Sequence, residues 1–443
     1  MSVSHRVRVD PQSLRLTKER GPHGATVSGC LPKCESAEPP VWRARRPVTR
    51  PGILYLTRTG LADPLGQSQV MGYLRGLSRN HDITLLTAEK IGDADDSFHM
   101  AALRADCAAH GIDWRPQRFR AGRIGAARNF ATMFKVAMRI MRQKPIALIH
   151  ARSYIPAAIA RALWRRTRVP FVFDMRALWL DEMIEAGRLT AGSPMERVLR
   201  RMERLCLRDA AGVVSLTAAA VTHLRGIYPS ELARQHVVVI PTCADLDRFP
   251  LCPPPDAPMV FGCVGSVTSG WFRLDWLDAL FGAAASDDPT ALFEVVTRDD
   301  PDVVRAGLPN VPTARLTIVS VPLEDVAARI AGHHASAMFY ATGPARLGSS
   351  PTRLAEILAT GRPVIANAGV GNVADIVTGH RVGVLMADCT MDAARAALSD
   401  LSALRHDPDL PDRARATAET LFSLEDGTRA YASLYDTILG SVS

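Results

Sequence analysis

The polar residues best suited to chemistry stand at the start of one predicted helix in the second half of the chain. The stretch 346–361 reads RLGSSPTRLAEILATG, with Ser350, Pro351 and Thr352 directly before an apolar-periodic run. Serine and threonine are common helix caps, and proline suits the first helical turn. The unpaired N–H groups of a helix start, with the positive end of the helix dipole, form an anion site. A diphosphate would fit such a site.

Two charged residues lie in the first turns of the same predicted helix. Arg353 and Glu356 are three positions apart and therefore share one helix face. A carboxylate that faces a cleft can accept hydrogen bonds from the hydroxyl groups of a ribose or another sugar. A capped helix with a Glu–Arg surface pair is the structural alternative, and the local sequence does not separate the two.

Further polar residues lie at the carboxyl ends of strands predicted in the first half. His150 and Arg152 close the strand 146–151, and Asp174 and Arg176 close the strand 171–175. Charges at the mouth of a sheet must be solvated or paired, so this cluster indicates a site, and we predict His150, Asp174 and Arg176 as its catalytic residues. An internal Asp174–Arg176 ion pair and a satisfied structural histidine are the competing interpretations.

Two series of short apolar strands, separated by helical segments, must position these side chains. Such alternation predicts parallel sheets covered on both faces, and ligands of such sheets bind at the carboxyl ends of the strands. Five prolines in residues 246–258 indicate a linker between the series. The predicted strands are 52–57, 82–87, 146–151, 171–175, 212–216 and 237–241, then 259–265, 292–297, 315–320, 337–340 and 363–367.

The predicted fold class is therefore α/β, with two doubly wound, Rossmann-like domains that face a cleft. Two such domains make the cleft between them the natural site. The expected segments are a disordered basic extension over 1–51, an N-terminal domain over 52–245, the linker 246–258, a C-terminal domain over 259–422, and a final helix over 423–443.

Composition narrows the class of protein. The 443 residues carry a net charge of +8, of which +6 lies in residues 1–52, so the rest is close to neutral and nucleic-acid binding is not expected. Eight scattered cysteines complete no zinc pattern and indicate free thiols of a reducing compartment. No apolar run reaches eighteen residues. We expect a cytoplasmic protein, and a peripheral contact with the inner face of a membrane stays open.

The run SPTRLAEILATGRPVIAN (350–367), followed by GVGNVADIV (369–377), resembles the donor-binding segment of GT-B glycosyltransferases, more closely that of the retaining, nucleotide-sugar-dependent family four. By this resemblance Glu356 binds the ribose of the donor, and Ser350, Pro351 and Thr352 cradle its phosphates. Members with a second glutamate place it at the position of Gly348, so its absence leaves the sugar open. The turn near the transferred sugar or the base is Gly369, Val370, Gly371 and Asn372.

Three other segments carry the resemblance. The run ILYLTRTGLADPLGQSQV (53–70) is similar to the first strand, loop and helix of these enzymes, and its glycines allow close backbone approach to a ligand. A turn built of turn residues explains the glycines alone. VGSVTSGWFR (264–273) opens the second domain, and residues 422–439 resemble the last helix, which crosses back to the N-terminal domain. The residues concerned are Gly60, Gly66, Gln67 and Ser68 in the first loop and Gly265, Ser266 and Arg273 in the second.

The resemblance implies transfer of a sugar from a nucleotide-diphosphate sugar to a saccharide or lipid-linked acceptor, with retention and with no metal or other cofactor. His150 then lies near the reacting sugar, Arg152 contacts phosphate or acceptor, and Arg273 and Arg353 neutralise the donor diphosphate. By analogy the pathway makes cell-surface polysaccharide or glycolipid. Two alternatives stay open: a nucleotide-sugar epimerase or hydrolase, with Asp174 and Glu182 as the candidate carboxylates, and a catalytically degenerate binding partner.

Overall fold

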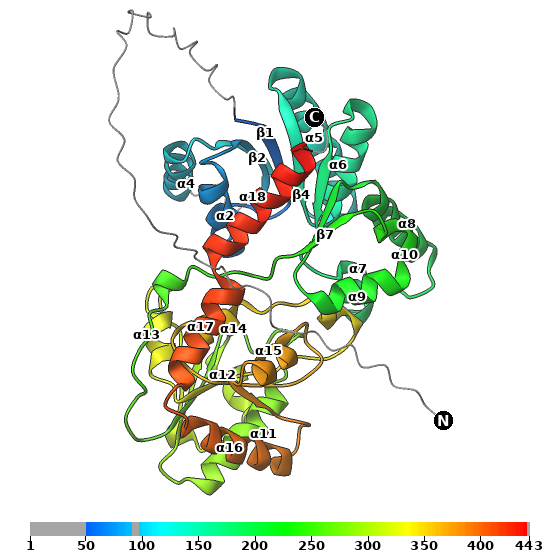
Figure 1. The fold of residues 1–443 in the computed structure, drawn as a ribbon. Coiled ribbons are helices and arrows are strands. Elements are labelled where there is room, and N and C mark those ends of the chain that lie inside the picture. Colours follow the sequence, from blue (N-terminus) through cyan, green and yellow to red (C-terminus); the bar gives the residue numbers. More distant parts are fainter. Residues whose placement is uncertain (1–49, 91–96, 441–443) are drawn as a thin grey trace, which may run out of the picture. The chain divides into compact units, whose positions relative to one another are not determined.

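The computed structural model describes residues 50–90 and 97–440, so the predicted extension 1–51 falls almost entirely outside the described residues. Two parallel sheets organise this part of the chain (Figure 1). The first has the order β3-β2-β1-β4-β5-β6-β7 and the second β10-β9-β8-β11-β12-β13. The predicted α/β class with two Rossmann-like sheets is confirmed.

The strands of the first sheet are β1 (Gly52–Thr57), β2 (Asp82–Glu89), β3 (Asp113–Arg118), β4 (Ile146–Arg152), β5 (Phe171–Asp174), β6 (Gly212–Ser215) and β7 (His236–Val239). Those of the second are β8 (Val260–Val264), β9 (Leu292–Val296), β10 (Leu316–Val319), β11 (Ala335–Met338), β12 (Val364–Ala366) and β13 (Gly383–Leu385). Every predicted strand overlaps one of these, whereas β3 and β13 were not predicted.

The helices of the first half are α1 (Pro64–Gly66), which continues into a π-helical turn (Gln67–Met71), α2 (Gly72–Leu77), α4 (Ser97–Ala109), α5 (Gly122–Gln143), α6 (Tyr154–Thr167), α7 (Trp179–Glu185), α8 (Pro194–Asp209), α9 (Ala218–Ile227) and α10 (Pro229–Leu232). Those of the second half are α11 (Leu274–Asp287), α12 (Pro301–Ala306), α13 (Val326–Ala331), α14 (Thr352–Ala359), α15 (Val373–Gly379), α16 (Met391–Arg405), α17 (Leu410–Phe422) and α18 (Leu424–Gly440).

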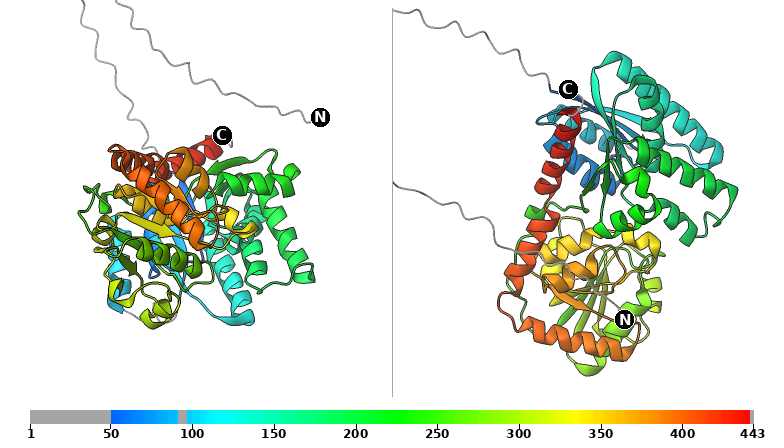
Figure 2. Two further views of the ribbon diagram at one scale, coloured as in Figure 1. Left: turned by 90° about the horizontal axis from the view of Figure 1, so that it is seen from below. Right: turned by 45° about the vertical axis from the view of Figure 1, so that its right-hand side comes forward.

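Alternation along the strands divides the core of the first sheet. In β1, Leu54 and Leu56 pack in one cluster with α5, α6 and α8, while Ile53 and Tyr55 pack in another with α2, α4 and α18. Successive strand residues point to opposite faces, so an all-apolar strand is covered on both. The last helix, α18, lies against α2 and β4, as predicted for the end of the chain (Figures 1 and 2).

The break between α17 and α18 falls at Ser423. A parallel bridge joins Ala244 to Ser423, so the end of the first half and the helix break lie side by side. Helix α17 packs against α14 and α18 against the first sheet. The six described cysteines are free, and Cys30 and Cys34 lie outside the described residues.

Candidate functional site

The start of helix α14 is open to a ligand. Pro351, with an extended backbone (φ −66°, ψ 123°), precedes the first helical residue Thr352. Among the described residues no side chain caps this helix. Ser350 Oγ instead accepts a hydrogen bond from the backbone N–H of Thr242 (3.1 Å). The helix start therefore keeps N–H groups that can donate to an anion.

The Glu356 carboxylate lies one turn inside α14 and is only partly accessible to solvent. No group in the described part of the chain donates a hydrogen bond to it. Burial raises the pKa of Glu356, and the charges of Arg353 and Arg248 oppose that rise. A partly buried carboxylate without donors has unmet hydrogen-bonding capacity, which two sugar hydroxyl groups can meet.

Arg353 packs directly on the glycine loop that follows β8. Gly265 has φ 97°, and a Cβ there would lie 2.3 Å from Nη2 of Arg353. Arg353 Nη2 donates to the carbonyl of Ser266 (3.3 Å). Its guanidinium also lies over the rings of Phe272 and Tyr340, 5.6 and 5.5 Å from their centroids. Arg353 Nη1 is buried and has no partner among the described residues, so the site holds a cation with an unused donor.

The other two residues predicted at the diphosphate are engaged by carboxylates. Ser266 Oγ donates to Asp299 (3.1 Å), which also accepts from two backbone N–H groups of the same loop. Burial raises the pKa of Asp299, but these hydrogen bonds outweigh it and the net shift is downward. Arg273 Nε donates to Asp275 (2.8 Å), and the Arg273 side chain is 42% exposed. An anion that used Ser266 or Arg273 would have to displace a carboxylate.

The predicted sugar-side turn 369–372 packs against the first half of the chain. Asn372 Oδ1 accepts from the N–H of Ala218, the first residue of α9 (2.9 Å). A Cβ at Gly371 would lie 2.1 Å from the carbonyl oxygen of Ser349. The structure thus brings this turn beside the loop that leads into α14, and its contact with the transferred sugar or the base stays a prediction.

Gly348, the position of the absent glutamate, has no room for a side chain. A Cβ there would lie 2.8 Å from the backbone nitrogen of Leu178 and 3.0 Å from its Cγ. The segment before α7 therefore occupies the space that a side chain at this position needs.

Next to Gly348, a buried arginine connects the two halves. Arg346 is 5% exposed, and its guanidinium lies 3.8 Å from the ring centroid of Trp271. It donates to Glu182 (3.3 Å) and lies 3.9 Å from Glu185, both on α7. Burial raises the pKa of Glu182, and Arg346 opposes that rise. The second carboxylate candidate of the epimerase interpretation is thus held in an ion pair.

A cavity of about 480 Å³ borders the start of α14. Its walls are mainly apolar and come from the ends of β6 and β7, the start of α9, helix α15 and the corner between α17 and α18. Leu354 lines it, whereas Arg353 and Glu356 do not. The cavity therefore lies on a different side of α14 from the unpartnered carboxylate. The described residues contain no cluster of His, Cys, Asp or Glu suited to a metal ion.

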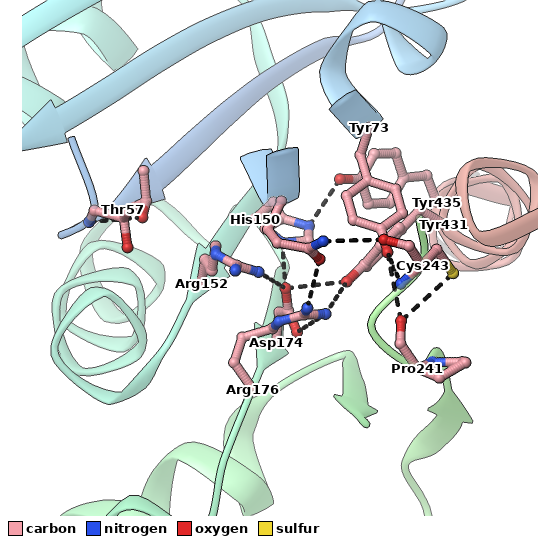
Figure 3. Close-up of polar contacts among 12 residues, drawn as sticks. Thr57, Tyr73, His150, Arg152, Asp174, Arg176, Pro241, Cys243, Tyr431 and Tyr435 are labelled. Atoms are coloured by element: carbon pink, nitrogen blue, oxygen red, sulfur yellow. Dashed lines mark hydrogen bonds and ion pairs between the residues drawn. The ribbon is translucent and has the colours of Figure 1, made fainter. Parts of the chain in front are cut away.

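His150 is fully buried between the first sheet and α18 (Figure 3). Nδ1 lies 2.7 Å from the hydroxyl of Tyr435 and Nε2 lies 3.4 Å from Asp174, while the ring stacks on Tyr55. Burial lowers the pKa of His150, so the ring is neutral. Both ring nitrogens are occupied, which favours the structural interpretation of this histidine over contact with a sugar.

Asp174 forms the centre of the same network. Its Oδ2 accepts from the hydroxyl of Tyr431 (3.1 Å), and Arg152 and Arg176 lie 3.6 and 3.8 Å from its carboxylate. Burial raises the pKa of Asp174, but the two arginines and His150 outweigh this effect. The net shift of the pKa is downward, which favours the ionised carboxylate. The arrangement includes the predicted internal ion pair. Catalytic roles for His150, Asp174 and Arg176 stay predictions.

Three buried atoms of this network have no hydrogen-bond partner among the described residues: Arg152 Nη1, Arg176 Nε and Asp174 Oδ1. Two guanidinium groups face one carboxylate, so the cluster carries a net positive charge at the carboxyl ends of β4 and β5.

Comparison with known proteins shows what the chain is similar to. Residues 66–243 match a family model described as a glycosyl transferase 4-like domain. Sucrose-phosphate synthase from Thermosynechococcus elongatus is similar in structure (TM-score 0.63), with 18% identity over 88% of this chain and 100% of that one. The family model covers residues 66–243, and the structural likeness shows that the chain has the GT-B fold.

Two further structures share the fold of this chain. HepE of Anabaena, solved in complex with UDP and glucose, has 15% identity over 87% of this chain and 99% of its own (TM-score 0.60). WaaG, a glycosyltransferase involved in lipopolysaccharide biosynthesis, has 16% identity over the same shares (TM-score 0.60). At such identities the likeness establishes the fold. No curated protein matches the sequence.

In the first loop, between β1 and the π-helical turn, the predicted glycines pack against neighbouring parts of the chain. A Cβ at Gly66 would lie 1.9 Å from the carbonyl oxygen of Gly60, and one at Gly60 would lie 2.3 Å from Glu89 Oε2. This packing favours the turn interpretation. Gln67 and Ser68 are exposed.

The residue that sequence reasoning missed in this loop is Gln69. It is buried, donates to the carbonyl of Cys243 (2.9 Å) and accepts from Arg176 (3.3 Å). The π-helical turn over Gln67–Met71 helps to place it inward. No local signal in QSQVM distinguishes the inward glutamine from its outward neighbours.

Proposed function

We propose that the protein is a glycosyltransferase that moves a sugar from a nucleotide-diphosphate sugar to a saccharide or lipid-linked acceptor, with retention of anomeric configuration. The observation that carries this proposal is the uncapped start of α14 beside the unpartnered carboxylate of Glu356. The resemblance to family four supports retention and a reaction that needs no metal.

The donor would bind along α14. Its diphosphate accepts hydrogen bonds from the N–H groups before Arg353, and its ribose hydroxyl groups donate to Glu356. The unused Nη1 of Arg353 can donate to a phosphate oxygen, since Nη2 already holds the loop at Ser266. A fixed cation and helix dipole stabilise the diphosphate as it leaves, and this lowers the barrier to transfer.

The acceptor would approach from the first sheet. Arg152, at the end of β4, has a buried Nη1 that lies 3.6 Å from Asp174 and has no hydrogen-bond partner in the described chain. The excess positive charge around Asp174 would be balanced by an anionic group of the acceptor or donor. This supports an acceptor that carries phosphate, as a lipid-linked saccharide does.

Two relatives support the choice of substrates. HepE of Anabaena has been solved with UDP and with UDP-glucose, and WaaG acts in lipopolysaccharide biosynthesis. We therefore propose a uridine-diphosphate sugar as the first donor to test, and synthesis of a cell-surface polysaccharide or glycolipid as the pathway.

The test compares Glu356→Ala with Glu324→Ala, an exposed carboxylate in the same half. Release of UDP from a panel of UDP-sugars is measured with and without lipid-linked and saccharide acceptors. Two lost charge-assisted hydrogen bonds should lower kcat/KM of Glu356→Ala by about 100-fold, with circular dichroism unchanged. Glu324→Ala should match the wild type.

The outcomes separate the proposal from its alternatives. Acceptor-dependent release of UDP supports transfer, whereas release or epimerisation without an acceptor supports the hydrolase or epimerase. Donor binding with no turnover would support a degenerate binding partner. Full activity in Glu356→Ala would end the proposed role of α14.

A further inference from the structure

One long segment in the first half of the chain contains basic residues and no acidic ones. Residues 114–173 contain fourteen lysines and arginines and no aspartate or glutamate. This segment alone carries +14, although the whole chain carries +8 and residues 1–52 contribute +6. The remaining residues therefore sum to −12. The near-neutral total of the chain beyond residue 52 conceals a strong separation of charge.

The structure gathers much of this charge on helix α5. Arg128, Lys135, Arg139 and Arg142 are exposed and lie seven, four and three positions apart, which puts them on one face of the helix. Helix α5 contains no acidic residue. The stripe runs along most of the 22-residue helix.

Helix α6 extends the basic face. Its last turn and the residue after it present Arg165, Arg166 and Arg168, all exposed. The guanidinium of Arg166 lies over the ring of Phe134 of α5, 5.0 Å from its centroid, so the two helices share one surface. Both helices cover the face of the first sheet opposite α2 and α18 (Figure 1). We call these seven residues on α5 and α6 the basic face.

The basic face is not neutralised from within. None of its seven cations has an ion-pair partner in the part of the chain that the structure describes. The carboxylates nearest to the segment pair with its other members: Asp113 with Arg115 and Lys144, and Asp209 with Arg161. A row of like charges destabilises a helix unless an external anion compensates it.

An apolar side chain marks the beginning of α5. Ile124, four positions before Arg128 and on the same face of the helix, is 72% exposed. Water alone does not favour such exposure, and a nucleic acid backbone gains little from Ile124. A bilayer surface offers both partners at once, since anionic headgroups attract the cations and the acyl boundary takes up the apolar side chain.

We propose that the basic face docks the protein on a membrane surface that contains anionic phospholipid. No helix among the described residues is long and apolar enough to cross a membrane, so the contact is with the surface. This inference rests on the charge and exposure of α5 and α6 and does not depend on the proposed function of α14.

The test is flotation of the full chain with vesicles of phosphatidylcholine alone or with 30% phosphatidylglycerol. The wild type should float with the anionic vesicles only, and 0.5 M NaCl should release it because salt screens the contact. The triple variant R128E/K135E/R139E should bind about 100-fold more weakly. The control R188E/R201E/R234E changes the charge equally at exposed arginines outside the segment and should bind as the wild type does.

Three results would overturn the proposal: equal binding to both vesicles, equal losses in both triple variants, or binding to single-stranded RNA with none to vesicles. The variant Ile124→Ser separates the apolar contribution. It should bind anionic vesicles several-fold more weakly and keep the salt dependence. Circular dichroism of each variant confirms that the helices are intact.

Discussion

Polar residues of similar kind lie near the strand ends of both sheets, but their hydrogen bonding differs. At the first sheet, Asp174 and His150 are enclosed by the tyrosines of α18: Tyr435 occupies one ring nitrogen of the histidine, and Tyr431 occupies one carboxylate oxygen of Asp174. The other ring nitrogen faces Asp174 itself. At the second sheet, Glu356 accepts no hydrogen bond from any described residue, and Arg353 keeps an unused donor. Polar residues at strand ends thus divide into those that hold the protein together and those left for a ligand.

The largest expected effect is a loss of stability, and it tests whether the polar residues at the first sheet hold the protein together. Asp174→Ala leaves Arg152 and Arg176 buried beside each other without their carboxylate. The free energy of unfolding should fall by about 3–5 kcal/mol. Urea unfolding followed by circular dichroism measures it.

A milder variant controls for the network as a whole. Tyr431→Phe removes one hydrogen bond to Asp174 and should cost about 1 kcal/mol. If Asp174→Ala were as stable as the wild type yet inactive, Asp174 would be a catalytic residue and the comparison would fail.

The next largest effect is a loss of ligand binding, and it tests the polar residues at the second sheet. Arg353→Ala removes the cation at the glycine loop and should weaken UDP binding by about 30-fold, measured by isothermal titration calorimetry. Arg273→Ala should cost about threefold or less, because Asp275 already neutralises that arginine. Equal losses in the two variants would show that the diphosphate lies nearer to Arg273.

A third prediction concerns Gly348, where the structure leaves no room for a side chain. Gly348→Ala should lower the free energy of unfolding by about 1–3 kcal/mol, since its Cβ meets Leu178. Gly348→Glu should also be destabilised and should not gain activity. As a control, Gly226→Ala on α9, where a Cβ meets nothing, should be neutral or slightly stabilising. A more active Gly348→Glu would mean that α7 moves away from this loop during turnover.

The smallest effect is a dependence of stability on pH. Burial raises the pKa of Glu356 in the folded protein above its unfolded value of about 4.3, so the ionised carboxylate costs stability at higher pH. Glu356→Gln removes that cost. Its melting temperature should exceed that of the wild type at pH 7.5, and the difference should vanish as the pH falls toward 4. A lower melting temperature at pH 7.5 would show that the carboxylate is stabilised by the protein itself.

Much of the scaffold could be predicted because its signals are local. Continuous apolar runs such as GILYLT predicted the buried strands, and the serines and proline before Thr352 predicted where α14 begins. Strand β3 was missed because DWRPQR is polar and contains a proline, which an edge strand tolerates. Strand β13 has only three residues, too few for a periodic signal.

For the candidate site, too, some features could be predicted from the sequence and others could not. Arg353 and Gly265 were both predicted at the donor diphosphate, from two separate segments, but their direct contact was not predicted. The saturation of His150 was not, because its partner Tyr435 lies 285 positions away in the chain. The same holds for Gly348, whose side-chain space is taken by Leu178 from the other half.

Residue type and order along the chain were sufficient for the strands, the helix starts and the places where charge could gather, since all of these depend on neighbours within a few positions. Folding decided which of those charged groups stay available. A hydrogen bond or a steric overlap depends on distance in space, and α18 and α7 bring distant residues to within a few ångströms of the strand ends. In the folded protein, Glu356 accepts no hydrogen bond from a described residue and Arg353 keeps an unused donor, so both remain available to a ligand.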